Sequence, residues 1–359
     1  MKFNKIFKTI LSVALAGTMM FGLAACGGTK DNDGQQSTGD NSAGKKPIVM
    51  VWYPNESAED YAPAREEFAR LIEQATGRKV EQKLTTDYVI AIESIANGTA
   101  SICFMGAQGY IEANNKSKDV QPLFVNSGSS GTLEDAIYYS FLNVKQGNED
   151  QYKDGSEFSI DNIAGKKMSF VSNSSTSGFK VPTSRIIQHF SKMAKWSNLD
   201  TDMLIEGGKN MFFSEVMFGG SHQGSAVNLL TGKADVAAFA DTEIAPYADL
   251  VEGEEAKPGA IYQIKENASA PFDVFKGEKF AVIQSTPVLN GPFAYNTKTL
   301  SQEEVDAIQK LFTSEEVTNN AQIFITEESG NVGMFPKSDK EHIVLVEDEW
   351  YNPIREMGN

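Results

Sequence analysis

The stretch KKMSFVSNSSTSGFKVPTSRIIQHF, residues 166–190, is the part of the sequence that says most about the fold. It begins with the strand-like run Lys167–Val171 and leads into apolar residues at helical spacing over Val181–Met193. Between the two lies a turn of serine and threonine that ends in Gly178-Phe179. A strand, a turn and a helix in this order predict one unit of an α/β fold.

The same alternation of strands and helices continues on both sides of this stretch. The predicted strands are Pro47–Tyr53, Lys79–Leu84, Ser101–Met105, Ile137–Val144, Met168–Val171, Val236–Phe239 and Phe280–Gln284. The predicted helices are one that begins at Ser57 or Asp60, then Tyr88–Ala96, Val181–Met193, Ala226–Thr231 and Ser301–Phe312, the last with Ser301 and Glu304 as a capping box. Because helices separate the strands, we expect mainly parallel sheets flanked by helices.

The first 25 residues have the composition of an export signal. Three lysines within residues 2–8 precede the apolar run Ile10–Leu23, and small residues then lead to Cys26 in the sequence LAAC. The apolar run is too short and wrongly flanked for a stable membrane span. LAAC followed by two glycines resembles a bacterial lipobox, so we expect residues 1–25 to be a lipoprotein signal peptide and Cys26 to carry lipid. An ordinary secretory signal with an incidental cysteine is the alternative.

Residues 26–46 are predicted to be the lipidated cysteine and a flexible tether, because residues 27–46 contain no large apolar side chain. We therefore expect an extracytoplasmic protein that is lipid-anchored to the outer face of the cell membrane. The chain carries 32 Lys and Arg against 48 Asp and Glu. Such an acidic chain repels nucleic acid, and any anion site in it must act locally, through dipoles and hydrogen bonds.

Cysteine usage leaves no internal disulfide if Cys26 is lipidated, because only Cys103 remains. Cys103 lies in the apolar run Ala100–Met105, so we expect a buried small hydrophobe rather than a catalytic thiol.

The turn Ser174-Ser175-Thr176-Ser177-Gly178-Phe179 has the chemistry of an anion site. Backbone N–H groups and the positive end of a helix attract an anion, and the hydroxyl groups add donors at short range. The alternative is that Ser175 or Ser177 only caps the helix.

A second candidate cluster begins at Gly219-Gly220-Ser221-His222 and leads into a helix over Gly224–Thr231. Its position at a loop-to-helix junction favours a ligand-facing His222 over a core histidine. Asp241 ends the strand that follows Gly232-Lys233-Ala234-Asp235, at the edge where α/β proteins usually place their sites. A carboxylate beside an oxyanion needs a shared proton, so Asp241 could select a protonated ligand; alternatively, it caps the next helix.

Taken together, these residues resemble the phosphonate-binding family of ABC transporter solute receptors over most of the chain after residue 46. The matching elements are Trp52-Tyr53-Pro54-Asn55-Glu56, Thr86-Asp87-Tyr88, Asn97-Gly98, Gly106-Ala107-Gln108-Gly109-Tyr110, Ser175–Phe179 with Pro182, Gly220–His222 and Gly232–Asp235. Ala107 stands where the family pattern has proline. The order and spacing of the elements make the resemblance specific.

The resemblance implies a type II periplasmic-binding-protein fold with ligand between two α/β lobes. Lobe I would comprise residues 47–132 and 290–359, and lobe II residues 133–289, with crossing strands near 127–137 and 286–292. It further implies a small phosphorus oxyanion (phosphonate, phosphite or phosphate) as ligand, an ABC permease as partner, a monomer, and no cofactor or metal. The ligand-binding residues carried over are Tyr53, Tyr110, Ser175, Thr176, Ser177 and His222, with Asp241 at or beside an often acidic position.

Two departures from the family pattern bear on specificity. About sixteen extra residues lie around Trp196–Phe212, where we expect a surface excursion. Gly291 stands before Pro292, where many relatives are expected to carry an acid. Since an aminoalkyl phosphonate needs acidic groups for its ammonium, Gly291 favours phosphite, phosphate or a simple alkylphosphonate.

Two other functions compete with this one. A hydrolase could use a serine with His222 and Asp241, but the sequence has no Gly-x-Ser-x-Gly elbow, so we do not expect an enzyme. A receptor for another small solute, such as a sugar, would need stacking aromatics, and among the tryptophans we expect only Trp52 near the cleft.

Overall fold

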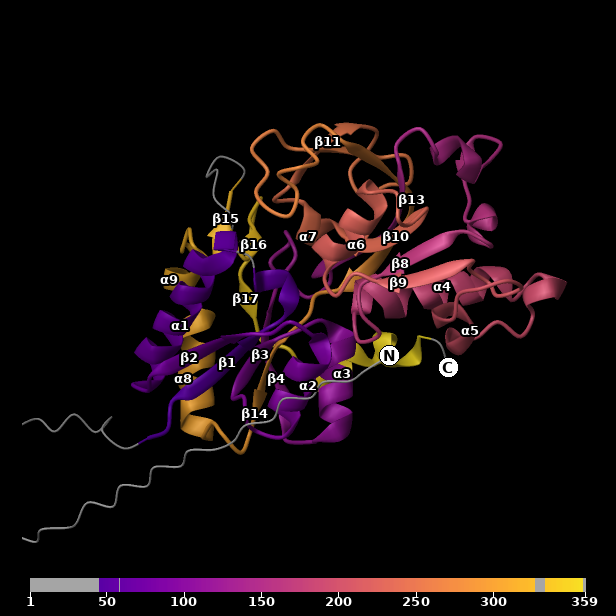
Figure 1. The fold of residues 1–359 in the computed structure, drawn as a ribbon. Coiled ribbons are helices and arrows are strands. Elements are labelled where there is room, and N and C mark those ends of the chain that lie inside the picture. The colour runs from indigo at the N-terminus through magenta and orange to yellow at the C-terminus, as the bar shows by residue number, and fades with distance from the viewer. Residues whose placement is uncertain (1–44, 58, 327–332, 358–359) are drawn as a thin grey trace, which may run out of the picture. The chain divides into compact units, whose positions relative to one another are not determined.

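The computed structural model describes residues 45–57, 59–326 and 333–357, which belong to one compact unit (Figure 1). The predicted signal peptide, Cys26 and the tether up to residue 44 lie outside the described residues. Within the described ranges, no helix is long and apolar enough to cross a membrane.

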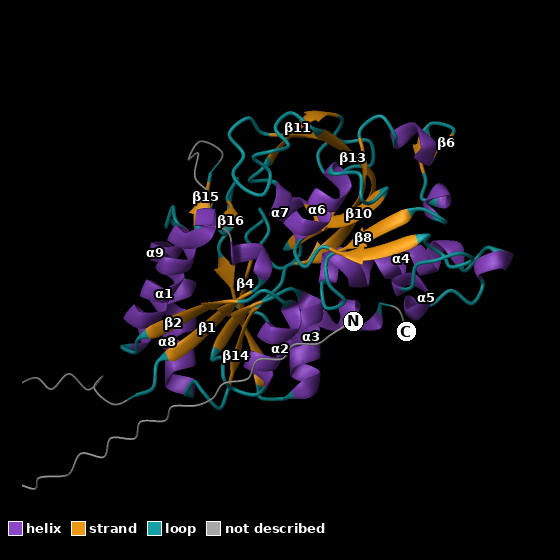
Figure 2. Ribbon diagram, in the orientation of Figure 1, coloured by secondary structure: helices purple, strands orange, loops and turns teal. Residues whose placement is uncertain are grey.

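The first sheet has six strands in the order β17-β4-β14-β3-β1-β2. These are β1 (Ile48–Trp52), β2 (Val80–Leu84), β3 (Ile102–Phe104), β4 (Val120–Asn126), β14 (Phe293–Asn296) and β17 (Ile343–Val344). Its helices are α1 (Ala62–Thr76), α2 (Tyr88–Ala96), α3 (Ala107–Lys116), α8 (Gln302–Phe312), α9 (Glu315–Thr318) and α10 (Asn352–Glu356). Figure 2 shows helices on both faces of this sheet, and we call the sheet with its helices lobe I.

The second sheet has seven strands in the order β11-β12-β13-β5-β10-β8-β9. These are β5 (Ile137–Lys145), β8 (Lys167–Phe170), β9 (Glu215–Phe218), β10 (Val236–Ala240), β11 (Ala248–Glu252), β12 (Ile261–Ile264) and β13 (Lys279–Leu289). Its helices are α4 (Val181–Phe190), α5 (Thr201–Ile205), α6 (His222–Leu230) and α7 (Asp241–Ile244). We call this sheet with its helices lobe II. Two small ribbons, β6 (Lys153–Asp154) with β7 (Glu157–Phe158) and β15 (Phe324–Ile325) with β16 (Phe335–Pro336), complete the strands.

The α/β class is as predicted, but the expectation of mainly parallel sheets is wrong. Parallel pairing is confined to β1 with β2 and β3, and to β8 with β9 and β10; the other pairs of the two large sheets are antiparallel. The reason lies in the connections. A parallel pair needs a crossover, usually a helix, and residues 253–260 and 265–278 between β11, β12 and β13 contain none.

The chain passes between the two sheets twice. Residues 127–136 join β4 to β5, and residues 290–292 join β13 to β14. The two passages are tied together where Asn290 N donates to Ala136 O at 3.0 Å, next to the antiparallel pairing of β5 with β13. The boundaries predicted for the lobes, at 132/133 and 289/290, stay a prediction.

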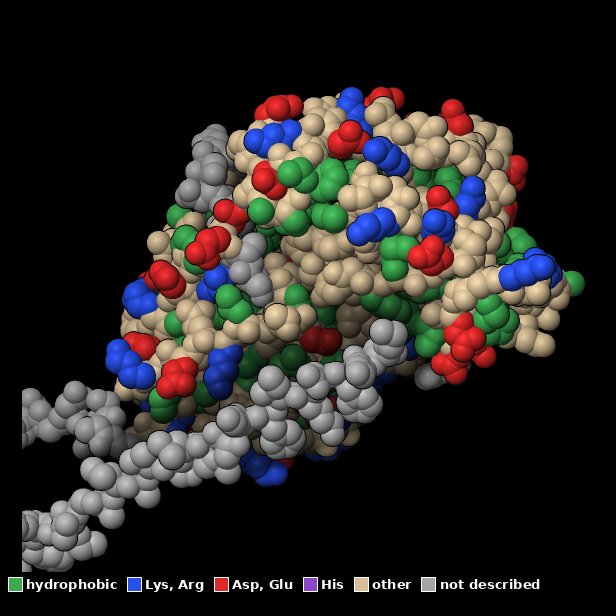
Figure 3. All heavy atoms as spheres, viewed as in Figure 1, with side chains coloured by type: hydrophobic (Ala, Val, Ile, Leu, Met, Phe, Trp, Pro, Cys, Tyr) green, Lys and Arg blue, Asp and Glu red, His purple; other side chains and the backbone are tan. Residues whose placement is uncertain are grey.

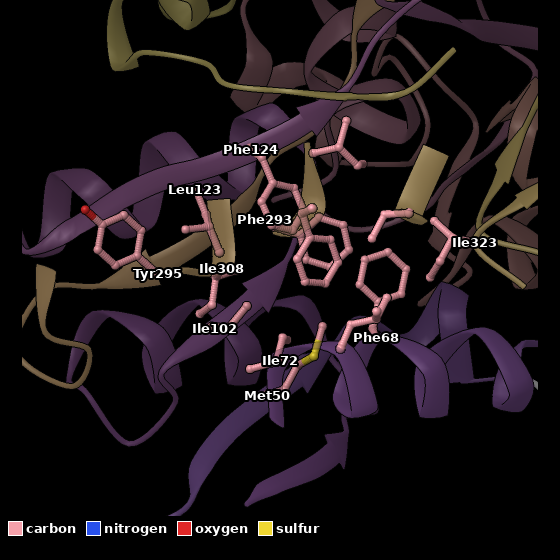
Figure 4. Packing of buried hydrophobic residues seen from close by; sticks show 14 of the residues in the cluster. Met50, Phe68, Ile72, Ile102, Leu123, Phe124, Phe293, Tyr295, Ile308 and Ile323 are labelled. Carbon is pink, nitrogen blue, oxygen red and sulfur yellow. The ribbon is translucent and has the colours of Figure 1, made fainter. Parts of the chain in front are cut away.

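The core of lobe I is built on the apolar side of the first predicted helix, α1. Phe68 of α1 is fully buried and stacks on Phe293 of β14 and Phe312 of α8, at 4.7 and 5.5 Å between ring centroids (Figure 4). The helix begins at Ala62 rather than at Ser57 or Asp60, because residues 54–57 and 59–61 form 3₁₀ turns. Cys103 is buried and unbridged, as predicted.

The segment around Trp196–Phe212 is largely exposed, as the predicted surface excursion requires, but a few of its side chains are buried. Phe212 is fully buried and meets Trp196 and Phe190 edge-on, with ring centroids 4.9 and 4.7 Å apart. Leu204 of α5 belongs to the same buried cluster. These apolar side chains attach the excursion to the core of lobe II, because burial removes their surface from water.

A capping box begins α8, as the sequence predicts. Ser301 Oγ accepts from Glu304 N, and the Glu304 carboxylate accepts from Ser301 N at 2.9 Å. We expect Ser301→Ala to lower the free energy of unfolding by about 1 kcal/mol, measured by urea denaturation. Ser314→Ala is the control, because Ser314 precedes α9 without a side-chain cap bond. An equal loss in both variants would contradict the assignment.

Candidate functional site

The hydroxyl-rich turn predicted to hold an anion is buried in lobe II. It forms the π-helical turn Thr176–Lys180 between β8 and α4, and Ser175, Thr176 and Ser177 are each 2% exposed or less. Ser175 is a helix cap, since its Oγ accepts from Gly178 N at 3.0 Å. Ser177 does not cap; its Oγ accepts from the Tyr138 hydroxyl at 3.1 Å. The capping alternative is therefore correct for Ser175 alone.

Steric crowding explains why a glycine stands at position 178 of this turn. A Cβ atom at Gly178 would lie 2.2 Å from Val171 Cγ2, at the end of β8. Any side chain would push the turn away from the strand, so glycine allows the helix start to sit directly on the strand end. The Ser140 hydroxyl then donates to Ser177 O at 2.6 Å, which holds the turn against β5.

Lobe I meets this turn with the N-terminus of α3. The backbone N–H of Gln108, in the first turn of α3, donates to Thr176 Oγ1 at 2.9 Å. A Cβ atom at Gly106, the N-cap of α3, would lie only 2.8 Å from the same oxygen. Two helix N-termini, one from each lobe, therefore converge where the sequence predicts one anion-binding turn.

Two tyrosines from lobe I line the same region. Tyr53 follows β1 directly and packs on Tyr88 of α2, with ring centroids 4.2 Å apart. The Tyr53 hydroxyl lies against the first turn of α3, where a Cβ at Gly109 would be 1.9 Å from it. The Tyr88 hydroxyl accepts from Asn55 Nδ2 at 2.8 Å and also has a side-chain hydrogen bond with Ser175 of lobe II.

His222 is the first residue of α6 and is 4% exposed. Its Nδ1 accepts from Ala240 N at 3.0 Å, and its own backbone N–H donates to Asn55 Oδ1 at 3.3 Å. Burial lowers the pKa of His222 from 6.5 to about 3, so the ring is neutral near neutral pH. Because Nδ1 accepts, the ring proton is on Nε2, which makes His222 a neutral hydrogen-bond donor.

Asp241 follows β10 directly, as the sequence predicts. Its Oδ1 accepts from Tyr139 N at 2.9 Å and from Thr242 N at 2.8 Å. Asp241 is the first residue of α7 and Ala240 is the N-cap, without a side-chain cap bond, so the capping alternative is wrong. Burial raises the pKa of Asp241 to about 7, although these two hydrogen bonds favour the charged form.

Two further acids were missed by the sequence analysis. Glu56 is 3% exposed, and burial, followed by repulsion from Glu243, raises its pKa well above the ordinary value. Burial raises the pKa of Glu243 to about 7; a hydrogen bond from Gln223 opposes this, and Asp241 adds to it. Glu56 stands within the first family element and Glu243 two residues after Asp241, so proximity in sequence was the available signal.

The expectation that Tyr110 binds the ligand is corrected by the structure, which does not bring the Tyr110 hydroxyl to this region. The hydroxyl donates to the Asp348 carboxylate, and the ring packs on Tyr351 with centroids 5.1 Å apart. Asp348 is also paired with Arg355. Tyr110 lies on the face of α3 that is covered by the C-terminal segment, and it anchors that segment.

Gly291 has a packing reason for lacking a side chain. A Cβ at this position would lie 2.2 Å from Met105 O and 2.8 Å from Gly106 Cα. An acidic residue cannot fit here without moving the backbone that carries the N-cap of α3. The carboxyl groups of this region come instead from Glu56, Asp241 and Glu243.

The structure thus gathers one polar cluster of buried and half-buried side chains, which we call the interlobe cluster. From lobe I it contains Tyr53, Asn55, Glu56 and Tyr88; from lobe II it contains Tyr138, Ser175, Thr176, Ser177, His222, Asp241 and Glu243. Hydroxyl groups, a neutral imidazole N–H and helix N-termini are suited to an anion. In the described part of the chain, no group of three or more His, Cys, Asp or Glu could hold a metal ion.

Comparison of the sequence with known proteins finds a matching family model and a similar protein. The family model described as "ABC transporter, phosphonate, periplasmic substrate-binding protein" matches residues 50–343. The phosphate-import protein PhnD of Mycolicibacterium smegmatis is 24% identical over 260 residues, which cover 72% of this chain and 74% of that protein.

Two solved structures resemble the fold. A binding protein component of an ABC phosphonate transporter from Pseudomonas aeruginosa has a TM-score of 0.58 at 17% identity, covering 88% of this chain and 86% of that one. PhnD1 from Prochlorococcus marinus (MIT 9301), in complex with methylphosphonate, has a TM-score of 0.60 at 12% identity, covering 87% of this chain and 97% of that one.

The protonation of His222 can be tested directly. A pKa lowered to about 3 means that folded His222 stays neutral at about pH 5, while the same residue in the unfolded chain is protonated below about 6.5. We expect long-range ¹H–¹⁵N NMR spectra at about pH 5 to show His222 with Nε2 protonated and Nδ1 unprotonated. The urea-unfolded chain is the control, and an imidazolium pattern in the folded protein would contradict the assignment.

Proposed function

The chain belongs to the family of periplasmic substrate-binding proteins of phosphonate ABC transporters, and we propose that it is the lipid-anchored receptor that captures a phosphorus oxyanion for such an importer. The family's members bind substrates for transport, so the chain is not an enzyme, and it acts outside the cytoplasm. The type II fold predicted from the resemblance is confirmed. The proposed ligand is a phosphonate, phosphite or phosphate, delivered to the ABC permease by a monomer.

The observation that carries the proposal is the meeting of the Ser175–Ser177 turn with the N-terminus of α3. A phosphorus oxyanion has three oxygens, or four in phosphate, and each must find a donor or keep a proton once water is removed. The donors proposed for it are the Thr176 and Ser177 hydroxyls, the hydroxyls of Tyr53 and Tyr88, and Nε2–H of His222; the Tyr138 hydroxyl donates to Ser177 Oγ and so orients that hydroxyl. Tyr110 is left out, because its hydroxyl is bonded to Asp348.

Hydrogen bonds between the lobes support capture by closure. Gln108 N donates to Thr176 Oγ1, His222 N donates to Asn55 Oδ1, and the Gln223 amide donates to Asn55 O at 3.4 Å. All of these break if the lobes separate. A ligand with donors from both lobes binds only the closed form, so it shifts the population toward that form, which we propose the permease recognises. A dissociation constant between about micromolar and nanomolar would be ordinary for such a site.

The lipid anchor rests on LAAC at residues 23–26 and on the polar residues 27–46. A flexible tether of this composition would keep the receptor beside the permease while leaving it free to rotate.

The carboxyl groups bear on which oxyanion is bound. Glu56, Asp241 and Glu243 repel a dianion, so they favour a ligand that carries a proton or a cationic group. The absence of an acid at Gly291 argued against an aminoalkyl phosphonate, but these three groups make it a candidate again. The Mycolicibacterium relative is named for phosphate import and the Prochlorococcus structure holds methylphosphonate, so both ligands belong in the test.

A thermal-shift panel on the full-length chain in detergent tests the ligand class. The compounds are phosphite, phosphate, methylphosphonate, 2-aminoethylphosphonate, sulfate and several sugars. We expect at least one phosphorus oxyanion to raise the melting temperature, because a ligand that binds only the native state stabilises it by mass action. Sulfate, which carries no proton at neutral pH, should give no shift. A shift with a sugar and with no phosphorus compound would show that the solute is wrong.

The hydroxyl turn is tested by the double variant Thr176→Val with Ser177→Ala. We expect the ligand-induced shift to disappear, because the variant removes two donors and the acceptor of Gln108 N. The melting temperature without ligand should change little. Thr201→Val with Ser197→Ala makes the same chemical changes at exposed positions of lobe II and should bind normally. Normal binding by the first double variant would exclude the turn from the ligand shell.

A further inference from the structure

Two buried acceptor atoms at the boundary between the lobes lack a hydrogen-bond donor among the residues that the structure describes. They are Glu56 Oε2, from lobe I, and Gln223 Oε1, from lobe II. Both residues are more than nine-tenths buried. A buried oxygen without a donor costs free energy, so each of these two atoms would be stabilised by a hydrogen-bond donor.

Gln223 bridges the two chain segments that carry Glu56 and Glu243. Its amide nitrogen donates to two backbone oxygens, that of Asn55, the residue before Glu56, at 3.4 Å and that of Glu243 at 3.4 Å. Glu56 and Glu243 therefore lie on neighbouring segments of the two lobes, and the charge of Glu243 raises the pKa of Glu56. The two carboxyl groups are brought together only when the lobes close.

The surroundings do not neutralise this pair. Arg65 is the cation that acts on Glu56, and its Nη1 donates to the backbone oxygen of Glu56. Arg65 favours the charged form of Glu56, but burial and Glu243 both outweigh it. The other titratable groups that interact electrostatically with the two carboxyls are all acidic or neutral. Near Glu56 they are Tyr53, Tyr61, Tyr88 and Cys103, and near Glu243 they are Tyr61, Tyr88, Tyr138, Asp241 and Tyr247. The acids Asp60, Glu112 and Glu255 interact in turn with members of these two groups.

We propose that the receptor takes up a proton together with its oxyanion, and that Glu56 and Glu243 hold this proton between the lobes when they close. A carboxylic acid O–H supplies a hydrogen-bond donor at this place and removes one of two neighbouring charges. The inference rests on the proposed function, since it takes closure around an oxyanion as given. It makes Glu56 and Glu243 the residues that set the charge of the acceptable ligand.

The direction of the pH dependence follows from the raised pKa values. Burial raises the pKa of both carboxyls, that of Glu243 to about 7, and opening the lobes would expose them to water and return both pKa values toward the ordinary range. The stabilisation of the closed form is therefore complete below the pKa of the open form, and is lost as the pH rises through about 7. A ligand that brings its own cationic group to this place would replace the proton.

Calorimetric titration of the full-length chain with methylphosphonate tests the proposal. Heats measured at about pH 6, in buffers that differ in ionisation enthalpy, give the number of protons taken up per ligand bound. We expect the wild type to take up about one proton more than the double variant Glu56→Gln with Glu243→Gln. Protons exchanged by methylphosphonate itself are the same in both chains and cancel. Glu66→Gln, at an exposed position of α1, is the matched control and should equal the wild type.

The outcomes separate this inference from the proposed function. Binding with equal proton uptake in the wild type and the double variant overturns the inference alone. Absence of binding by the wild type with phosphite, phosphate, methylphosphonate and 2-aminoethylphosphonate overturns the proposed function and the inference together. Should the double variant lose its cooperative melting transition, the two single variants serve instead. Each must then take up fewer protons than Glu66→Gln, and equality would overturn the inference.

Discussion

The hydrogen bond from Gln108 N to Thr176 Oγ1 is the contact on which the rest of the site depends. It joins the N-termini of two helices whose positive ends would otherwise repel each other. Gly106 and Gly178 make the approach possible, since a Cβ atom on either would collide with Thr176 or Val171. An anion placed between two such helix ends would be stabilised by both, so the proposed capture would need both lobes.

The low dielectric constant inside the interlobe cluster disfavours the charged forms of its histidine and its carboxyl groups. Burial keeps His222 neutral and raises the pKa of Glu56, Asp241 and Glu243. The surface charge does little to attract an anion. The whole chain has a net charge of −16, and Figure 3 shows acidic and basic side chains interspersed on the face in view. In the proposed site, binding would depend on oriented dipoles and on protons held by the protein, rather than on a basic surface.

If the proposed proton uptake is correct, specificity depends on which group carries one proton. A phosphorus oxyanion would bring the proton, the carboxyl pair would hold it, or an ammonium group of the ligand would replace it. These arrangements have the same total charge but different hydrogen-bond geometry. Because the three carboxyl groups come from both lobes, the proposed site would discriminate among ligands during closure, when burial makes an unpaired charge unfavourable.

Local patterns in the sequence were enough for much of this protein. Tyr88–Ala96 is helical at the predicted bounds, the Ser301–Glu304 capping box forms, and the Ser175–Ser177 turn precedes a helix as predicted, because these features depend on neighbours within a few residues. Strand direction, the burial of Trp196 and Phe212, the bond from Tyr110 to Asp348 and the proximity of Glu56 and Glu243 were missed. Each of these depends on which segments, distant in sequence, pack against each other. A periodic pattern can indicate that a side chain is buried, but only the tertiary structure decides what it is buried against.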